Sequence, residues 1–172
     1  MHVLVATDGN LDPEAVTGFT APLAGPDGKV TVLTVIAIPR RLLSEMRGVF
    51  GERPAPDVDG DAEYVGMTTK SGAPPVGWPG DTEMIERYLS DKKQQRCAPL
   101  AEALEAAGVS VETNVMESEK ISRTIIGEAT RLGADLLVIG SHGEGRFEGR
   151  LGSTGSKIAR HATTPLLLLR AK

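Results

Sequence analysis

Only one cysteine, Cys97, occurs in the chain, so no disulfide bond can form within it. Disulfides belong to oxidising compartments, and a chain that forms none favours a reducing cytoplasm. The apolar runs are far shorter than the roughly 20 residues that a membrane-spanning helix requires. A strand pattern begins directly at the N-terminus, so we also expect no signal peptide. The sequence therefore predicts a soluble, cytoplasmic protein with no membrane partner.

Positive charge is not in excess either. Nineteen lysines and arginines against 23 acidic residues give a formal net charge of -4. This balance argues against a protein that binds nucleic acid through bulk positive charge, although a local basic patch is compatible with it. Apolar residues make up 40% and charged residues 24% of the 172 positions, which is typical of a single globular domain.

The motifs of several enzyme classes are also missing. Lys157 follows Ser156 rather than glycine, so the chain has no Gly-x-x-x-x-Gly-Lys-Ser/Thr loop of the P-loop ATPases. The three histidines do not fall at metal-ligand spacing with the cysteine, which argues against a zinc site. No serine, histidine and acid set for nucleophilic catalysis stands out. We therefore assign no catalytic residue and no metal ligand, and expect a binding protein rather than an enzyme.

What the sequence does contain is a regular alternation of strand and helix patterns. Asp12 and Pro13 predict the start of the first helix, and Gly108 and Gly133 are placed to end two later ones. Parallel strands joined by helices predict an α/β protein with a doubly wound sheet and helices on both faces. The expected strands cover residues 2–7, 30–38, 109–115, 136–139 and 165–170, and the expected helices 13–23, 81–107, 121–133 and 153–161.

Residues 39–80 interrupt this order. The segment holds most of the prolines and the only tryptophan, Trp78. Loops of this length inside a compact domain are usually functional or disordered. We favour a flexible insertion within one domain of residues 1–172, with an ordered lid as the alternative. Helical spacing of the apolar residues in its first part predicts a short amphipathic helix there, formed by Leu42, Leu43, Met46 and Phe50.

A glycine-rich turn follows the apolar run 136–139. Residues 140–143 read GSHG, and Gly152 with Ser153 then opens the last expected helix. Glycine lets a ligand approach the backbone, and the free N–H groups of a first helical turn bind anions. In doubly wound sheets ligands bind beyond the carboxyl ends of the strands where the strand order reverses. If the first and fourth strands are neighbours, Thr7 and Asp8 lie beside this turn.

Each of these residues also has a simpler interpretation. Gly140 and Gly143 suit a tight turn without a ligand, and Asp8 suits a turn cap. Ser153 and Thr154 are ordinary residues for a helix start, so capping is at least as good an explanation as phosphate contact. Arg146 and Arg150 suit phosphate neutralisation or plain solvation, and for His142 we expect no catalytic role. His161, near the end of the last expected helix, is well placed for the helix dipole.

Taken together, these motifs resemble the universal stress protein family. The resemblance is carried by residues 6–9 (ATDG), the turn 140–143, Gly152 with Ser153, and a closing proline followed by four leucines. It covers the chain except for residues 39–80. It implies five parallel strands in the order 3-2-1-4-5 and a homodimer. An edge strand of four leucines, 165–170, also invites pairing with another chain, and we place the dimer contact there.

For the ligand, the resemblance implies an adenine nucleotide, ATP or AMP, with Mg²⁺ accompanying ATP and at most slow hydrolysis. Asp8 and Val35 would contact the adenine end and Gly140 the ribose, while Gly143, Gly152 and Ser153 would lie at the phosphates. ATP-binding members share the pattern Gly, two residues, Gly, nine residues, then Gly-Ser or Gly-Thr. Here only eight residues, 144–151, separate Gly143 from Gly152.

Two other functions stay open. The eight-residue spacing is compatible with a nucleotide-free, dimeric interaction protein of the same fold. An enzyme that uses residues 39–80 as a lid is the third hypothesis, and it lacks an evident acid/base or metal constellation.

Overall fold

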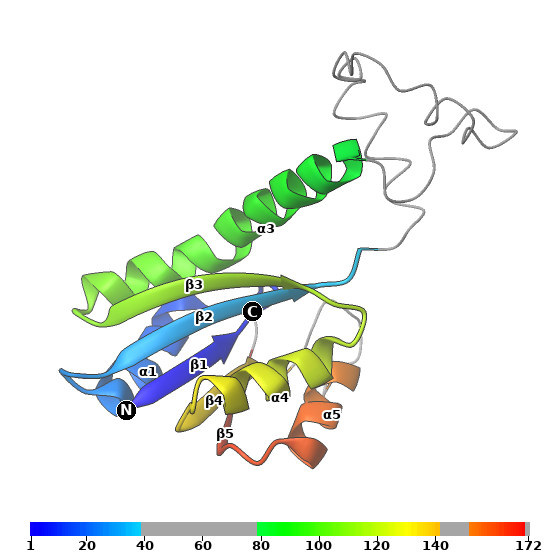
Figure 1. Ribbon diagram of the computed structural model, residues 1–172. Helices are drawn as coiled ribbons and strands as arrows, with labels where there is room; N and C mark the ends of the chain where they lie inside the picture. Colours follow the sequence, from blue (N-terminus) through cyan, green and yellow to red (C-terminus); the bar gives the residue numbers. More distant parts are fainter. Residues whose placement is uncertain (39–78, 142–151, 171–172) are drawn as a thin grey trace, which may run out of the picture. The chain divides into compact units, whose positions relative to one another are not determined.

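A computed structural model describes residues 1–38, 79–141 and 152–170 of the chain, with side chains of the long helix from residue 85 onward. The chain divides into two compact units, one formed by Met1–Ala37 and Ser90–Lys172 and the other by Ile38–Leu89. The first unit holds a five-stranded sheet in the order β3-β2-β1-β4-β5 (Figure 1). All the strand pairs are parallel, so the expected doubly wound fold is confirmed.

Strands and helices alternate along the chain as the sequence predicts. Their bounds are β1 His2–Ala6, α1 Pro13–Ala24, β2 Lys29–Ile36, α3 Pro79–Ala106, β3 Ser110–Glu117, α4 Ile121–Arg131, β4 Leu136–Gly140, α5 Ser153–His161 and β5 Leu166–Leu169.

The third strand runs two residues beyond its expected end at Val115. Its ladder with β2 continues through Val35↔Met116 and Ile36↔Glu117, and the Ser118 N–H donates to the Ile36 carbonyl oxygen at 2.9 Å. Pairing with a neighbouring strand therefore extends β3 past the alternating pattern in its own sequence.

The strand order reverses between β1 and β4. β1 pairs with β2 on one side and with β4 on the other, and the second pairing runs from Val3↔Leu136 to Ala6↔Ile139. The carboxyl ends of β1 and β4 are therefore side by side, which is where ligands bind in doubly wound sheets.

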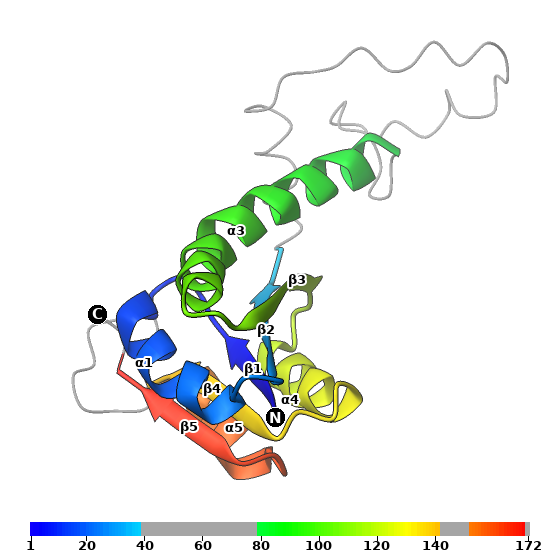
Figure 2. The same cartoon turned by 90° about the vertical axis from the view of Figure 1, so that its left-hand side faces the viewer.

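Helices cover both faces of the sheet (Figures 1 and 2). Val3 and Val5 point into one core with α1 and with the part of α3 that follows Ser90, while Leu4 and Ala6 point into the other with α4 and α5. This alternation is the period of two that a strand imposes on its side chains. The apolar residues of each strand thus hold the two helical layers in place.

The helix ends agree in part with the sequence patterns. Gly108 and Gly133 adopt φ of +80° and +60°, the left-handed conformation that glycine accepts at the end of a helix. Asp12 occupies the N-cap position of α1 with Pro13 after it, but its side chain makes no capping hydrogen bond. Asp12 therefore lies at the expected N-cap position, but its side chain does not cap the helix.

The insertion predicted at residues 39–80, with its short amphipathic helix, lies almost wholly outside the described residues and stays a prediction. None of the helices in the described ranges is long and apolar enough to span a bilayer.

Candidate functional site

Thr7 shapes the loop that leaves β1. Its backbone N–H donates to the Leu33 carbonyl oxygen at 2.9 Å, and its Oγ1 accepts a hydrogen bond from the Gly9 N–H at 2.9 Å. The side chain is buried, and its hydroxyl oxygen forms a hydrogen bond within the loop. Gly9 then takes φ of +101°, which turns the chain sharply away from the strand.

Asp8 is exposed at the tip of this loop. Its Oδ1 accepts a hydrogen bond from the Asn10 N–H at 3.2 Å, so the side chain does cap the turn. Its Oδ2 has no hydrogen-bond partner within the described ranges. Turn capping and a ligand role are therefore compatible, because one carboxylate oxygen serves each.

Two backbone hydrogen bonds close the other half of the site. The Ser141 N–H donates to the Leu169 carbonyl oxygen at 2.7 Å, and the Gly152 N–H donates to the Ser141 carbonyl oxygen at 3.2 Å. The second bond ties the start of α5 directly to the end of β4. Gly140 is half-buried as the last residue of β4, whereas Gly143 lies outside the described residues.

Within the described residues, no side chain caps the N-terminus of α5. Gly152 is its N-cap residue and supplies no side-chain acceptor, so no capping side chain satisfies the N–H groups of the first turn. Ser153 is exposed and Thr154 half-buried in that turn. Free backbone donors at a helix N-terminus attract anions, which supports the expected phosphate end.

Val35 lies one strand away from this pair of loops. It is 7% exposed and packs in the core between β2 and α4. The structure thus brings together Thr7, Asp8, Gly140, Gly152 and Ser153 at one edge of the sheet, with Val35 in the adjoining strand.

One charged residue at this edge was missed from the sequence. A Cβ atom built on Gly9 would lie 3.2 Å from Cγ of Arg96, so the stem of this arginine packs against the loop after β1. Arg96 sits in α3, far from Gly9 in the sequence, and no local pattern connects the two.

Among the residues that the structure describes, the groups with shifted pKa values lie outside these loops. Burial raises the pKa of the Cys97 thiol to about 11, only partly offset by the charges of Lys93 and Arg96. The hydrogen bond from Arg131 lowers the pKa of the Glu128 carboxyl. Cys97 lies in one core and Glu128 on α4, so neither supplies an acid or base to the loops after β1 and β4.

The strand order and the parallel pairing define an α/β protein of the doubly wound class. The sequence matches the Universal stress protein family over residues 1–170, and the chain belongs to that family. A universal stress protein of Mycolicibacterium smegmatis is 50% identical over 40 residues, which is 23% of this chain and 14% of that protein. The chain therefore matches only a small part of that relative's length.

Two solved structures share the fold. A universal stress protein family protein from Arabidopsis thaliana with AMP bound has a TM-score of 0.58 at 14% identity, covering 100% of this chain and 92% of its own. A universal stress protein in complex with cAMP has a TM-score of 0.54 at 20% identity, with 100% and 98% covered.

Proposed function

We propose that the protein binds an adenine nucleotide, AMP or ATP, at the carboxyl ends of β1 and β4. The observation that carries the proposal is the hydrogen bond between the Gly152 N–H and the Ser141 carbonyl oxygen, 3.2 Å long. It fixes an uncapped helix N-terminus beside the point where the strand order reverses. Relatives of the same fold hold AMP or cAMP, which supports the choice of ligand.

Each end of the nucleotide has matching groups on the protein. The Oδ2 of Asp8 would accept from the adenine amino group or a ribose hydroxyl, and Val35, although 7% exposed, would contact the base. Gly140 would lie at the ribose. The amides of the first turn of α5, with the hydroxyls of Ser153 and Thr154, would donate to the phosphates.

Whether AMP or ATP binds depends on the protein groups that contact the phosphates. Gly143 and the eight residues before Gly152 contribute to this end in the proposal, and they lie outside the described residues. Mg²⁺ bound together with ATP would neutralise the additional phosphates, so we expect ATP to bind only with Mg²⁺ and hydrolysis to be slow at most.

A second part of the proposal is a cytoplasmic homodimer formed through β5. This strand is an edge of the sheet, and Leu168 within it is 42% exposed. An open apolar edge favours pairing with a second copy of the same strand. The same dimer is expected under the alternative hypothesis, in which the protein is a nucleotide-free interaction protein.

Calorimetric titration of the full chain with AMP, and with ATP plus Mg²⁺, tests the nucleotide proposal. We expect saturable binding, and about tenfold weaker binding after Asp8→Asn, which keeps an acceptor for the Asn10 N–H but removes the charge. Asp27→Asn is the matched control, because Asp27 is exposed in the turn before β2, at the opposite edge of the sheet. Equal binding of GTP, or equal effects of both variants, would contradict the adenine assignment.

A further inference from the structure

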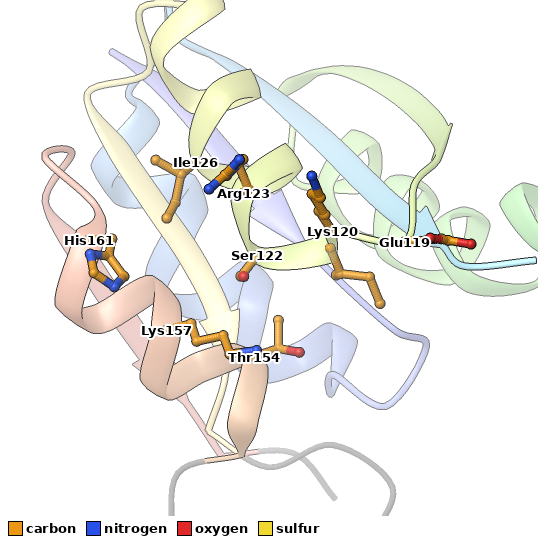
Figure 3. Close-up of a pocket in the computed structure, with 9 residues that line it drawn as sticks. Glu119, Lys120, Ser122, Arg123, Ile126, Thr154, Lys157 and His161 are labelled. Atoms are coloured by element: carbon orange, nitrogen blue, oxygen red, sulfur yellow. The ribbon is translucent and has the colours of Figure 1, made fainter.

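A groove separate from the switch-point loops lies between α4 and α5 (Figure 3). Its volume is about 670 Å³, within the range of roughly 300–1,000 Å³ that small-molecule sites occupy. Ser122, Arg123 and Ile126 line it from α4, and Lys157 and His161 line it from α5. Of its lining residues in the described ranges, only Thr154 also belongs to the proposed nucleotide site.

The groove concentrates positive charge in a chain whose net charge is negative. Among the lining residues that the structure describes, Lys120, Arg123 and Lys157 carry positive charge, His161 adds a fourth basic side chain, and Glu119 is the single acid. Glu119 and His161 lie at opposite ends of the groove (Figure 3). None of the four basic side chains forms an ion pair with another residue in the part of the chain that the structure describes. The positive charges of Lys120, Arg123 and Lys157 are thus not used in ion pairs with the described residues.

The basic residues at the start of α4 are placed unfavourably for the helix dipole. Lys120 is the N-cap residue, has no acceptor on its side chain and makes no capping bond, and the first turn contains no acid. Cations near a helix N-terminus are unfavourable because the dipole is positive there. An anion in the groove would reverse this cost, since it would meet both the helix amides and the lysine and arginine side chains.

The groove also has an apolar part. Ile121 and Ile126 are half-buried where they line it, and both pack against the core beneath α4. Hydroxyls of Ser122 and Thr154 complete the lining as donors. A ligand that fits would therefore join negative charge to an apolar body.

We infer that the α4–α5 groove binds a small phosphorylated molecule that carries at least two negative charges, separately from the nucleotide at the switch point. Lys120, Arg123, Lys157 and His161 bind the phosphates, and Ile121 and Ile126 contact the apolar body. Lysine and arginine are the side chains that proteins use for phosphate, and two charges on the ligand match the spread of cations over both helices.

Titration of the ¹⁵N-labelled full chain with inorganic pyrophosphate tests this inference by NMR. We expect saturable shifts at the amides of Ile121, Ser122 and Arg123, and weaker binding of inorganic phosphate. The double variant Arg123→Gln/Lys157→Gln should weaken pyrophosphate binding about tenfold or more. Lys29→Gln is the matched control, since Lys29 lies at the amino end of β2 and pairs only weakly with Glu112.

Three results would overturn the inference. They are a lack of saturable binding, an equal loss of affinity in the control variant, and shifts confined to the loops after β1 and β4. A second variant distinguishes a loss of pyrophosphate binding from a loss of folded structure. Arg123→Glu should abolish pyrophosphate binding and raise the melting temperature of the ligand-free protein, because it places an acid in the first turn of α4. A fall in melting temperature would contradict the unfavourable charge on which the inference rests.

Discussion

The guanidinium of Arg131 donates two hydrogen bonds to the carboxylate of Glu128, one from Nη2 to Oε1 at 2.7 Å and one from Nε to Oε2 at 2.8 Å. Glu128 is only 5% exposed, although it carries a charge. The amide of Asn114 on β3 approaches Oε1 at 3.5 Å from the other side. The hydrogen bond from Arg131 is the main reason that the pKa of Glu128 lies below its usual value, and it outweighs the opposing effect of burial. This carboxylate therefore links α4 to β3 in its ionised form.

Replacing this carboxylate should destabilise the protein in a pH-dependent way. Glu128→Gln keeps the shape but removes the charge, and we expect a loss of about 1–2 kcal/mol in the free energy of unfolding at pH 7. Because the folded pKa is lowered, the wild-type advantage is present above the unfolded pKa and is lost as the pH falls through the folded pKa. Urea denaturation at neutral and acid pH measures both effects. Glu112→Gln, in an exposed pair 3.5 Å long, is the control and should cost less than about 0.5 kcal/mol.

The thiol of Cys97 should be inert in the native protein. It is fully buried, and its pKa of about 11 leaves it protonated at pH 8, whereas only the thiolate is nucleophilic. Absorbance measurements with an aromatic disulfide reagent should show no reaction in buffer and rapid reaction of one thiol per chain in guanidinium chloride. Fast labelling of the native chain would show that α3 opens away from the sheet.

Ser153→Glu should separate nucleotide binding from stability. A glutamate in the first turn of α5 interacts favourably with the helix dipole, so the free energy of unfolding should rise by about 0.5 kcal/mol or stay unchanged. Its negative charge would repel the phosphates, and we expect the affinity for ATP to fall about tenfold or more. Ser153→Ala removes only the hydroxyl and serves as the neutral comparison. Calorimetry would refute the assigned phosphate end if the glutamate variant bound ATP as well as the alanine variant does.

The edge strand β5 should control oligomeric state. Leu168→Lys places a charge on the exposed part of this strand, and charged residues on an edge oppose pairing with another sheet. We expect sedimentation equilibrium to show a dimer for the unaltered chain and a monomer for the variant, with the same far-ultraviolet circular dichroism. Glu112→Lys puts the same side chain on β3, the other edge strand, and should leave the dimer intact. A monomeric unaltered chain would contradict the proposed assembly.

The fold was accessible from the sequence because its signals are local. Apolar runs such as residues 136–139 and the glycines at helix ends fixed the type and order of the elements. What local patterns miss is contact between distant segments. The stem of Arg96 against Gly9 and the extension of β3 to Glu117 depend on neighbours that a single stretch does not contain.

Only part of the candidate site could be predicted from the sequence, for the same reason. Strand-end positions and glycines indicated Asp8 and Gly140, and the pairing of β1 with β4 places their loops at the same edge. The α4–α5 groove gave no such signal, because its basic residues are spread over two helices more than 20 positions apart and look like solvated charges on each one alone. Only the packing of the two helices gathers them.

Chemical-shift mapping with AMP is the sharpest test of nucleotide binding at the ends of β1 and β4, because it reports both binding and location. On adding AMP to the ¹⁵N-labelled full chain, we expect saturable shifts at the amides of Thr7, Asp8, Gly140 and Ser153. The absence of any shift at about 1 mM AMP, where binding as weak as about -4 kcal/mol would be visible, would contradict the proposed nucleotide site. Shifts confined to the α4–α5 groove would contradict it equally, by moving the nucleotide away from the ends of β1 and β4.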